Sequence, residues 1–293
     1  METEILDGGL QKNVEKAAKI LKNGGLVAIP TETVYGLAAD ALNPDAVAKI
    51  FKAKGRPMDN PLIVHICRFE EIYRLVKGVP HKAKELADRY WPGPLTIILP
   101  KSDIIPKEVS AELPTVAVRM PSHPVARAII EKTGRPLAAP SANSSGLPSP
   151  TTAKHVMDDM NGKIDAIVDG GSCDVGIEST VVTLATDPPR LLRPGGITHE
   201  QLEEVLGHVD IDPAVLSQLK EGERPASPGM KYWGEQCILF LSGDDLGATL
   251  YGGGQRSGYD ERVSLRRDDE EKACRIERSK RHSSYHIWRH NRP

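Results

Sequence analysis

Long apolar runs and aromatic residues are both scarce in this chain. No stretch of roughly 18 apolar residues occurs, which argues against a transmembrane helix, and residues 1–12 lack the basic start and apolar stretch of a signal peptide. Aromatic side chains make up only 4% of the 293 residues, so the core has to be aliphatic. Charged residues make up 27%, as in ordinary globular proteins. The sequence therefore predicts a cytoplasmic protein without membrane contacts.

Paired cysteines are missing as well. Cys67, Cys173, Cys237 and Cys274 lie far apart, and no C-x-x-C pair occurs. Such spacing argues against a disulfide framework and against a structural zinc site. We expect free thiols.

The chain also lacks a strong charge of one sign over most of its length. The net charge is −2, with 11 Lys/Arg against 7 Asp/Glu in residues 256–293, so those residues carry +4 and residues 1–255 carry −6. A protein that binds the sugar–phosphate backbone of a nucleic acid normally offers a basic face. The main part of the chain is therefore not expected to bind polyanions in general.

Two common catalytic signatures do not occur. The P-loop pattern G-x-x-x-x-G-K-[ST] is absent, and so is the G-x-S-x-G pattern of a nucleophile elbow. The serine-rich segment 141–146 can be interpreted as a loop that cradles phosphate, but its composition favours a plain turn-rich connection.

What is present is an alternation of helical and β-rich segments. Asn43 and Pro44 form a helix start, Gly55 a helix end, and residues 198–201 a capping box. The predicted helices are 13–23, 45–54, 68–77, 80–90, 122–133, 152–160 and 198–207, and the predicted strands are 26–30, 61–66, 95–100, 115–120, 137–140, 165–170 and 179–184. This order predicts an α/β domain with a twisted mixed sheet and flanking helices over residues 1–207.

Cations and carboxylates gather near the predicted strand ends. Lys54, Arg56, Arg119 and Arg193 would form an anion pocket if the fold brings them together, although each alone could be a solvated surface charge. His65 follows an apolar run, where a histidine is more often a core residue than a ligand. The carboxylates Glu32, Asp59 and Glu178 are candidate magnesium or acid–base groups, or else caps and turn residues.

Six segments in order resemble one known family. They are PTETVYGL (30–37), KAKGRP with NPLIVHI (52–66), WPGPLT (91–96), AVRMP (117–121), APSAN (139–143) and GIESTVV (176–182). From about Leu21 to Gly207 the chain resembles the YrdC-like threonylcarbamoyl-AMP synthase family, in its longer form. The resemblance implies a twisted sheet bent around a concave cavity.

The resemblance also implies a reaction. L-Threonine and bicarbonate or CO2 would give a carbamate that attacks the α-phosphate of ATP, releasing pyrophosphate and leaving threonylcarbamoyl-AMP. Mg2+ would accompany the ATP, and a separate transferase would pass the threonylcarbamoyl group to tRNA. Positioning and charge neutralisation suffice for both steps, because the amine and then the carbamate act as nucleophiles.

The family's site residues carry over motif by motif. The resemblance implies a threonine site of Thr33, His65, Arg119, the Ala139 backbone and Ser179. It implies a nucleotide site of Arg56, Asn60, Thr115, Ser141, Asn143, Ser149 and Arg193, with Lys54 and Arg56 as the catalytic cations.

The sequence departs from the family near its end. A linker is predicted over 208–232 and contains SPGMKY (227–232), but the family's His-Tyr-Ala-Pro segment does not follow. Residues 233–293 are polar and arginine-rich, which predicts a largely disordered, altered or truncated tail. His282, His286 and His290 recur every four residues there, but no metal site is expected without a core around them.

Two other functions remain open at this point. A non-catalytic module that binds tRNA or double-stranded RNA is the main alternative, against which the −6 charge of residues 1–255 argues. The carbamoyl-transfer domain of hydrogenase maturation shares the implied fold, but the acylphosphatase and zinc modules expected with it are missing here.

Overall fold

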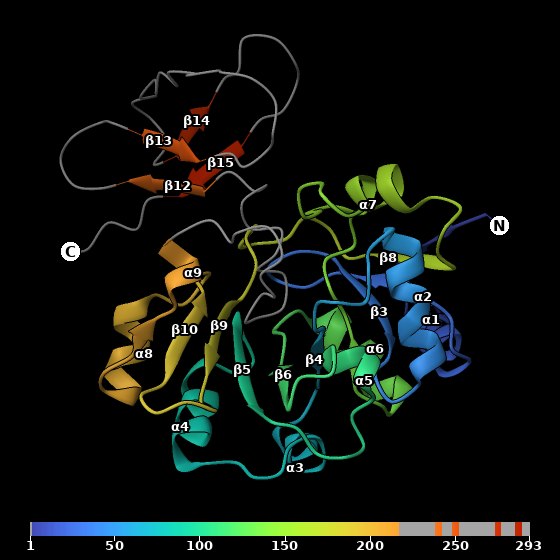
Figure 1. Ribbon diagram of the computed structural model, residues 1–293. Coiled ribbons are helices and arrows are strands. Elements are labelled where there is room, and N and C mark those ends of the chain that lie inside the picture. The colour runs from blue at the N-terminus through green and yellow to red at the C-terminus, as the bar shows by residue number, and fades with distance from the viewer. Residues whose placement is uncertain (1, 217–237, 242–247, 252–272, 277–284, 289–293) are drawn as a thin grey trace. The chain divides into compact units, whose positions relative to one another are not determined.

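The computed structural model describes residues 2–216, 238–241, 248–251, 273–276 and 285–288 (Figure 1). Contacts between Cα atoms divide the chain into two units, Met1–Trp233 and Gly234–Pro293. The predicted site residues all lie in the first unit.

The first unit is built on an 11-stranded sheet in the order β1-β8-β2-β3-β7-β4-β6-β5-β9-β10-β11. Both parallel pairs, such as β4 with β6, and antiparallel pairs, such as β5 with β6, occur. The strands are β1 (Glu4–Asp7), β2 (Val27–Ile29), β3 (Gly36–Asp40), β4 (Ile63–His65), β5 (Leu95–Pro100), β6 (Thr115–Arg119), β7 (Leu137–Ala138), β8 (Ala166–Asp169), β9 (Thr180–Thr183), β10 (Arg190–Arg193) and β11 (Asp210–Ile211). The predicted mixed sheet is confirmed.

Helices cover this sheet, and most of them were predicted. They are α1 (Gln11–Lys22), α2 (Pro44–Lys54), α3 (Ile72–Leu75), α4 (His81–Tyr90), α5 (Lys107–Ser110), α6 (Pro124–Thr133), α7 (Ala153–Met160), α8 (His199–Leu206) and α9 (Pro213–Leu216). The segment predicted as one helix over 68–77 is a 3-10 turn, Phe69–Glu71, followed by α3. In Figure 1, α1 and α2 lie near one end of the sheet and α4 and α8 near the other.

Alternate residues along each strand serve opposite faces of the sheet. On one face, residues such as Val64, Val118 and Ile97 join the largest core cluster, which also holds residues of α2, α4, α7 and α8. On the opposite face, α1 and α6 pack on β1, β8, β2 and β3 through a second aliphatic cluster that includes Val27 and Ile129. Beyond those strands the same face carries the predicted site residues.

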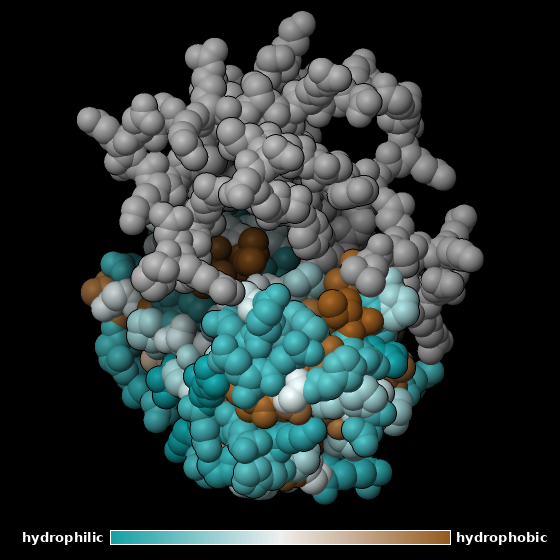
Figure 2. Space-filling model, turned by 90° about the vertical axis from the view of Figure 1, so that its left-hand side faces the viewer, coloured by the Kyte–Doolittle hydropathy of each residue, from teal (hydrophilic) through white to brown (hydrophobic). Residues whose placement is uncertain are grey.

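On the side of the molecule in Figure 2, apolar side chains of the described residues form only small patches among hydrophilic ones.

The start of α2 depends on one side chain. The Asn43 side-chain Oδ1 accepts hydrogen bonds from the backbone amides of Asp45, at 3.1 Å, and Ala46, at 3.2 Å. Replacing Asn43 with alanine should therefore cost about 1 kcal/mol of unfolding free energy, measurable by urea denaturation. The exposed Lys52→Ala substitution later in the same helix is the control, and an equal loss in both variants would contradict the capping role.

The C-terminal unit contains short strands that were not predicted. β12 (Ile238–Leu241) pairs antiparallel with β13 (Ala248–Tyr251), and β14 (Ala273–Ile276) pairs antiparallel with β15 (Tyr285–Trp288). The rest of the predicted tail and linker residues 217–232 lie outside the described residues, as do His282 and His290. Disorder of 233–293 therefore stays a prediction. The predicted linker begins with β11 and α9.

The sequence argued against a membrane-spanning helix and against paired cysteines, and the described residues bear on both points. Within that part of the chain no helix has both the length and the apolar character needed to cross a bilayer. Cys67 and Cys173 are free thiols, as predicted, while the side chains of Cys237 and Cys274 lie outside the description.

Candidate functional site

Residues from five neighbouring strands form one row across the sheet. His65 of β4 lies opposite Arg119 of β6, and Arg119 lies opposite Thr96 of β5. Thr96 lies opposite Val181 of β9, which in turn pairs with Arg193 of β10. Directly paired residues of a sheet share a face. The register therefore brings the predicted His65 and Arg119 onto the face opposite the main core. Arg193 follows a β-bulge and joins them by donating to the Ser179 hydroxyl, which is hydrogen-bonded to Thr96.

Arg119 is held by two acceptors from different loops. Its Nη2 donates to Glu32 Oε1 at 2.7 Å, and its Nε donates to the Gly93 carbonyl at 3.3 Å. The Arg119 and Glu32 side chains are 4% and 7% exposed, so this ion pair is buried. Glu32, which the sequence suggested as a magnesium or acid–base group, is thus the partner of the predicted threonine-binding arginine.

The loop that carries Glu32 and Thr33 is internally bonded. The Thr31 hydroxyl accepts from the Val34 amide at 3.2 Å and shares a hydrogen bond of 2.9 Å with the Thr33 hydroxyl. The Val175 amide donates to the Glu32 carbonyl and the Gly176 amide to the Thr33 carbonyl. The predicted site residue Thr33 is therefore buried and fixed beside the loop that leads to Ser179.

His65 is buried and electrically neutral. Burial, and then the positive charge of Arg119, lower the pKa of His65 to about 3. Its Nδ1 lies 3.2 Å from the Ile63 carbonyl, which can only accept, and in the tautomer with the proton on Nδ1 the Nε2 atom is an acceptor. His65 can therefore accept a hydrogen bond from a substrate hydroxyl or amine without adding charge.

Ser179 connects the predicted threonine and nucleotide residues. Its hydroxyl shares a hydrogen bond of 2.7 Å with the Thr96 hydroxyl. Arg193 donates to it from Nη2 at 3.0 Å, and to the Ser179 carbonyl from Nε at 3.0 Å. Burial lowers the pKa of Arg193 to about 10, a shift that Glu178 opposes and Arg119 reinforces. The sequence did not predict Thr96 as a site residue, because threonine is common inside strands and only the strand register shows which residues lie beside it.

Lys54 stabilises the serine-rich segment 141–146 through hydrogen bonds to its backbone. The ammonium, at the end of α2, donates to the carbonyls of Ser141 and Asn143, the latter at 2.6 Å, and to Asn143 Oδ1 at 3.2 Å. The Ser145 amide donates back to the Lys54 carbonyl at 3.0 Å. Burial and the nearby Arg56 charge lower the pKa of Lys54 to about 7. Lys54 is buried, with 5% of its surface exposed.

The remaining predicted residues lie in loops that follow α2 and β7, except Thr115, which lies on β6. Arg56 and Asn60 are buried and follow Gly55, whose φ of 63° ends α2. The Ala139 amide donates to the Ile63 carbonyl, and Ser149 donates to Glu178 at 2.6 Å. Thr115 stands apart from the arginine row, because it lies four residues from Arg119 along β6, about 13 Å at 3.3 Å per residue.

Between Thr115 and the polar row lies an apolar floor. Ile63, Ala117, Ile98, Val181 and Leu192 form a separate buried cluster. Ile63, Ala117 and Ile98 are each two residues from the row formed by His65, Arg119 and Thr96, so they share its face. The face thus offers charged and hydroxyl groups at one end and aliphatic surface beside them.

The candidate carboxylates Glu32 and Glu178 both have partners in the structure. Glu32 pairs with Arg119, and Glu178 accepts from Ser149. Within the described residues no group of three or more His, Cys, Asp or Glu side chains is placed to hold a metal ion.

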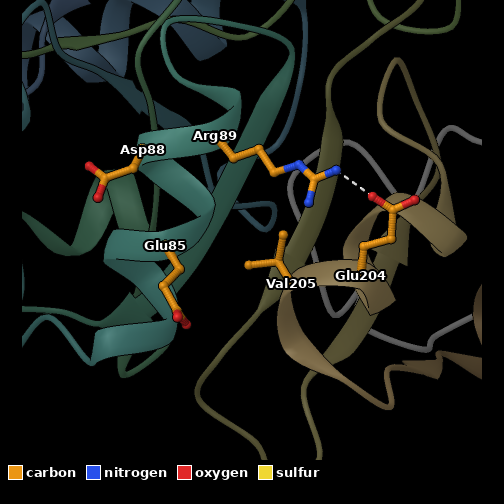
Figure 3. Close-up of a pocket in the computed structure, with 5 residues that line it drawn as sticks. All are labelled: Glu85, Asp88, Arg89, Glu204 and Val205. Carbon is orange, nitrogen blue, oxygen red and sulfur yellow. Dashed lines mark hydrogen bonds and ion pairs between the residues drawn. The ribbon is translucent and has the colours of Figure 1, made fainter.

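A surface hollow lies away from this face. It has a volume of about 440 Å³, lies between α4 and α8, and is lined by Glu85, Asp88, Arg89, Glu204 and Val205 (Figure 3). Arg89 bridges the two helices through an ion pair with Glu204. None of the predicted site residues lines the hollow, and its carboxylates would repel a nucleotide.

Comparisons with known proteins identify the family of this chain. The model of the Sua5/YciO/YrdC family, described as "Telomere recombination", matches residues 19–195. The threonylcarbamoyl-AMP synthase of Pyrococcus abyssi is 55% identical over 216 residues, 74% of this chain and 63% of that protein. The Bacillus subtilis protein of the same name is 55% identical over 75% of this chain and 63% of its own. The chain thus spans about 63% of the length of these curated relatives.

A solved structure shares the fold. The crystal structure of Pyrococcus abyssi Sua5 complexed with L-threonine matches with a TM-score of 0.75 and 50% identity. The match covers 79% of this chain and 68% of that one.

Proposed function

Because the chain belongs to the Sua5/YciO/YrdC family, we propose that it is a threonylcarbamoyl-AMP synthase that uses L-threonine, bicarbonate or CO2, and ATP. The observation that carries the proposal is the buried row in which His65 and Arg119 share one face of the sheet, joined by Arg193 through the Ser179 hydroxyl. A crystal structure of the Pyrococcus abyssi relative contains L-threonine, which supports an amino-acid pocket on this fold.

The threonine end of the site is proposed around Arg119. A guanidinium is the side chain best suited to a carboxylate, because it offers several donors in one plane. His65 would accept from the substrate hydroxyl or amine, and Ser179 and Thr33 would fix its orientation, with the Ala139 carbonyl as a further acceptor. All of these groups are buried, so they would act in a site that excludes water.

The nucleotide end is proposed along the Lys54 loop and the apolar floor. Lys54 and Arg56 would neutralise phosphate charge, while Asn60, Ser141, Asn143 and Ser149 would contact the nucleotide, with Arg193 and Thr115 at its two ends. Mg2+ is proposed as the counterion that arrives with the ATP phosphates, since the described residues contain no three-ligand cluster.

The chemistry needs no protein nucleophile. The threonine nitrogen forms a bond to CO2 and loses a proton, or bicarbonate reacts with loss of water. A carbamate oxygen then bonds to the α-phosphorus of ATP, and the bond from that phosphorus to the β-phosphate oxygen breaks, with pyrophosphate leaving. The protein's proposed contribution is to align the reactants and offset the charge.

Location and partner belong to the same proposal. We expect a cytoplasmic enzyme whose product is taken up by a separate tRNA threonylcarbamoyl transferase. The RNA-binding alternative has less support, because the −6 charge of residues 1–255 disfavours contacts to a nucleic-acid backbone.

Pyrophosphate release tests this function. The purified full chain with ATP, Mg2+, bicarbonate and L-threonine should release pyrophosphate, and omission of threonine or bicarbonate should stop it. L-Alanine, which lacks the hydroxyl, serves as the matched control substrate, and mass spectrometry should detect threonylcarbamoyl-AMP. Pyrophosphate release that is independent of threonine would contradict the proposal.

A further inference from the structure

We propose that Glu32 is a positioning residue that fixes the Arg119 guanidinium for the substrate carboxylate. This inference deepens the proposed function and rests on it. The Glu32 side chain forms an ion pair with Arg119, a predicted site residue, so its effect on the substrate would pass through Arg119.

The guanidinium is constrained on one side. Glu32 Oε1 accepts from Nη2 at 2.7 Å and the Gly93 carbonyl accepts from Nε at 3.3 Å. Two acceptors on different nitrogens define the plane of a guanidinium and stop it from rotating. No described residue accepts from Nη1, so its two N–H groups and the second N–H of Nη2 are left for a carboxylate.

Glu32 is itself fixed, as a positioning group has to be. Its Oε2 accepts from the Ser122 amide at 3.1 Å, and its backbone carbonyl accepts from the Val175 amide at 2.8 Å. Ser122 lies just beyond β6, the strand of Arg119, and Val175 lies in the loop before Ser179. The carboxylate therefore ties the PTETV loop to two other segments of the site.

Both carboxylate oxygens accept a hydrogen bond, one from Arg119 and the other from the Ser122 amide. Each oxygen keeps a further lone pair, but these two bonds and the burial of the pair suit a group that holds the guanidinium. Burial would raise the pKa of Glu32, but Arg119 and the hydrogen bonds outweigh it and lower the pKa below 4.5. The group therefore stays ionised at neutral pH.

The charge of Glu32 also balances a crowded set of cations. Arg119 and Arg193 are both buried and close enough for each charge to influence the other. An uncompensated Arg119 in this setting would be costly to bury and would be drawn away from its position toward water. Loss of the Glu32 charge should therefore misplace Arg119 rather than merely remove a contact.

The test is a double-mutant cycle of Glu32→Gln, Arg119→Ala and the double variant, with the threonine KM, the ATP KM and the melting temperature measured for each. Glu32→Gln should raise the threonine KM at least about tenfold and leave the ATP KM within about twofold. In the Arg119→Ala background, Glu32→Gln should change the threonine KM by less than about twofold, because the effects of substitutions at two coupled residues do not add.

Asp40→Asn is the matched structural control. Asp40 is another buried carboxylate paired with an arginine, Arg135, but it lies on β3 and touches no predicted site residue. Asp40→Asn should lower the melting temperature and leave the threonine KM unchanged. If Glu32→Gln behaves in the same way, the positioning role is wrong.

The remaining outcomes are distinguishable. Fully additive effects of Glu32→Gln and Arg119→Ala on the threonine KM would mean that Glu32 acts on the substrate independently, which overturns the inference. Should Glu32→Gln fail to fold, Glu32→Asp keeps the charge but shortens the side chain, and the inference still requires a higher threonine KM. A parent chain without threonine-dependent pyrophosphate release would overturn the proposed function as well.

Discussion

Replacing Arg119 with alanine is expected to reduce kcat/KM for threonine on the order of 30- to 1,000-fold. This range corresponds to about 2–4 kcal/mol, the usual cost of removing one partner from a buried, charge-assisted carboxylate contact. The ATP KM should change much less, because the proposed nucleotide contacts are made by other residues. Steady-state pyrophosphate release with each substrate varied in turn measures both constants.

The same substitution should also destabilise the protein in a pH-dependent way. In the parent, the folded-state pKa of Glu32 lies below 4.5, so its pairing contributes stability above that pH and loses it as the pH falls through the folded-state pKa. Without Arg119, burial raises the pKa of Glu32 instead. The melting-temperature difference between the parent and Arg119→Ala should therefore be largest near neutral pH and should shrink as the pH falls from the raised pKa of the variant toward the lowered pKa of the parent.

The control for Arg119 is Arg135→Ala, which removes the exposed partner of Asp40 outside the site. It should leave both KM values unchanged. If Arg119→Ala and the parent depend equally on threonine, the assignment of Arg119 to the threonine carboxylate is wrong.

Replacing Lys54 with methionine is expected to lower the rate of pyrophosphate release on the order of 100-fold, the typical effect of removing a positioned charge from a reaction centre. Two effects combine here. The phosphates lose a cation, and the loop that carries Ser141 and Asn143 loses the ammonium that holds its carbonyls. The threonine KM should change little, since Arg119 and Glu32 are untouched.

Proton uptake provides an independent measurement for Lys54. Its pKa of about 7 in the free protein leaves Lys54 incompletely protonated at pH 8. Phosphates placed nearby would raise that pKa, so ATP binding at pH 8 should take up a fraction of a proton. Calorimetry in buffers of different ionisation enthalpy detects this uptake, and it should vanish in Lys54→Met.

Lys52→Met is the matched control, because Lys52 is an exposed lysine on the same helix. It should keep both the rate and the proton uptake of the parent. A Lys54→Met variant with a much lower melting temperature but full activity would show that Lys54 only holds the loop.

Local signals predicted most of the secondary structure. Asn43 and Thr198 each cap a helix as their positions in the sequence indicate, because a cap needs only a side-chain oxygen within a few residues of free amides. The β-branched runs around Val64, Val118 and Val182 became strands for an equally local reason, since branched side chains suit a pleated surface.

The strand β3 could not be predicted in this way. Its residues, Gly36–Asp40, include Gly, Ala and Asp, which are depleted in strands. They form a strand because β2 and β7 lie on either side and supply hydrogen-bond partners, and small side chains allow close packing there. β10 was missed for a related reason, since a four-residue strand that starts and ends with arginine lacks a clear apolar alternation.

By itself, the sequence determined the helices and most strands, because these depend on neighbours a few positions away along the chain. It also determined the residue types of the site, because they lie in motifs that can be compared with those of a family. Only the tertiary structure decided which of those residues meet. Glu32 pairs with Arg119, 87 residues away, and Lys54 holds the Asn143 carbonyl, 89 residues away. Such pairings follow from strand register and loop packing across the whole sheet, which no local pattern specifies.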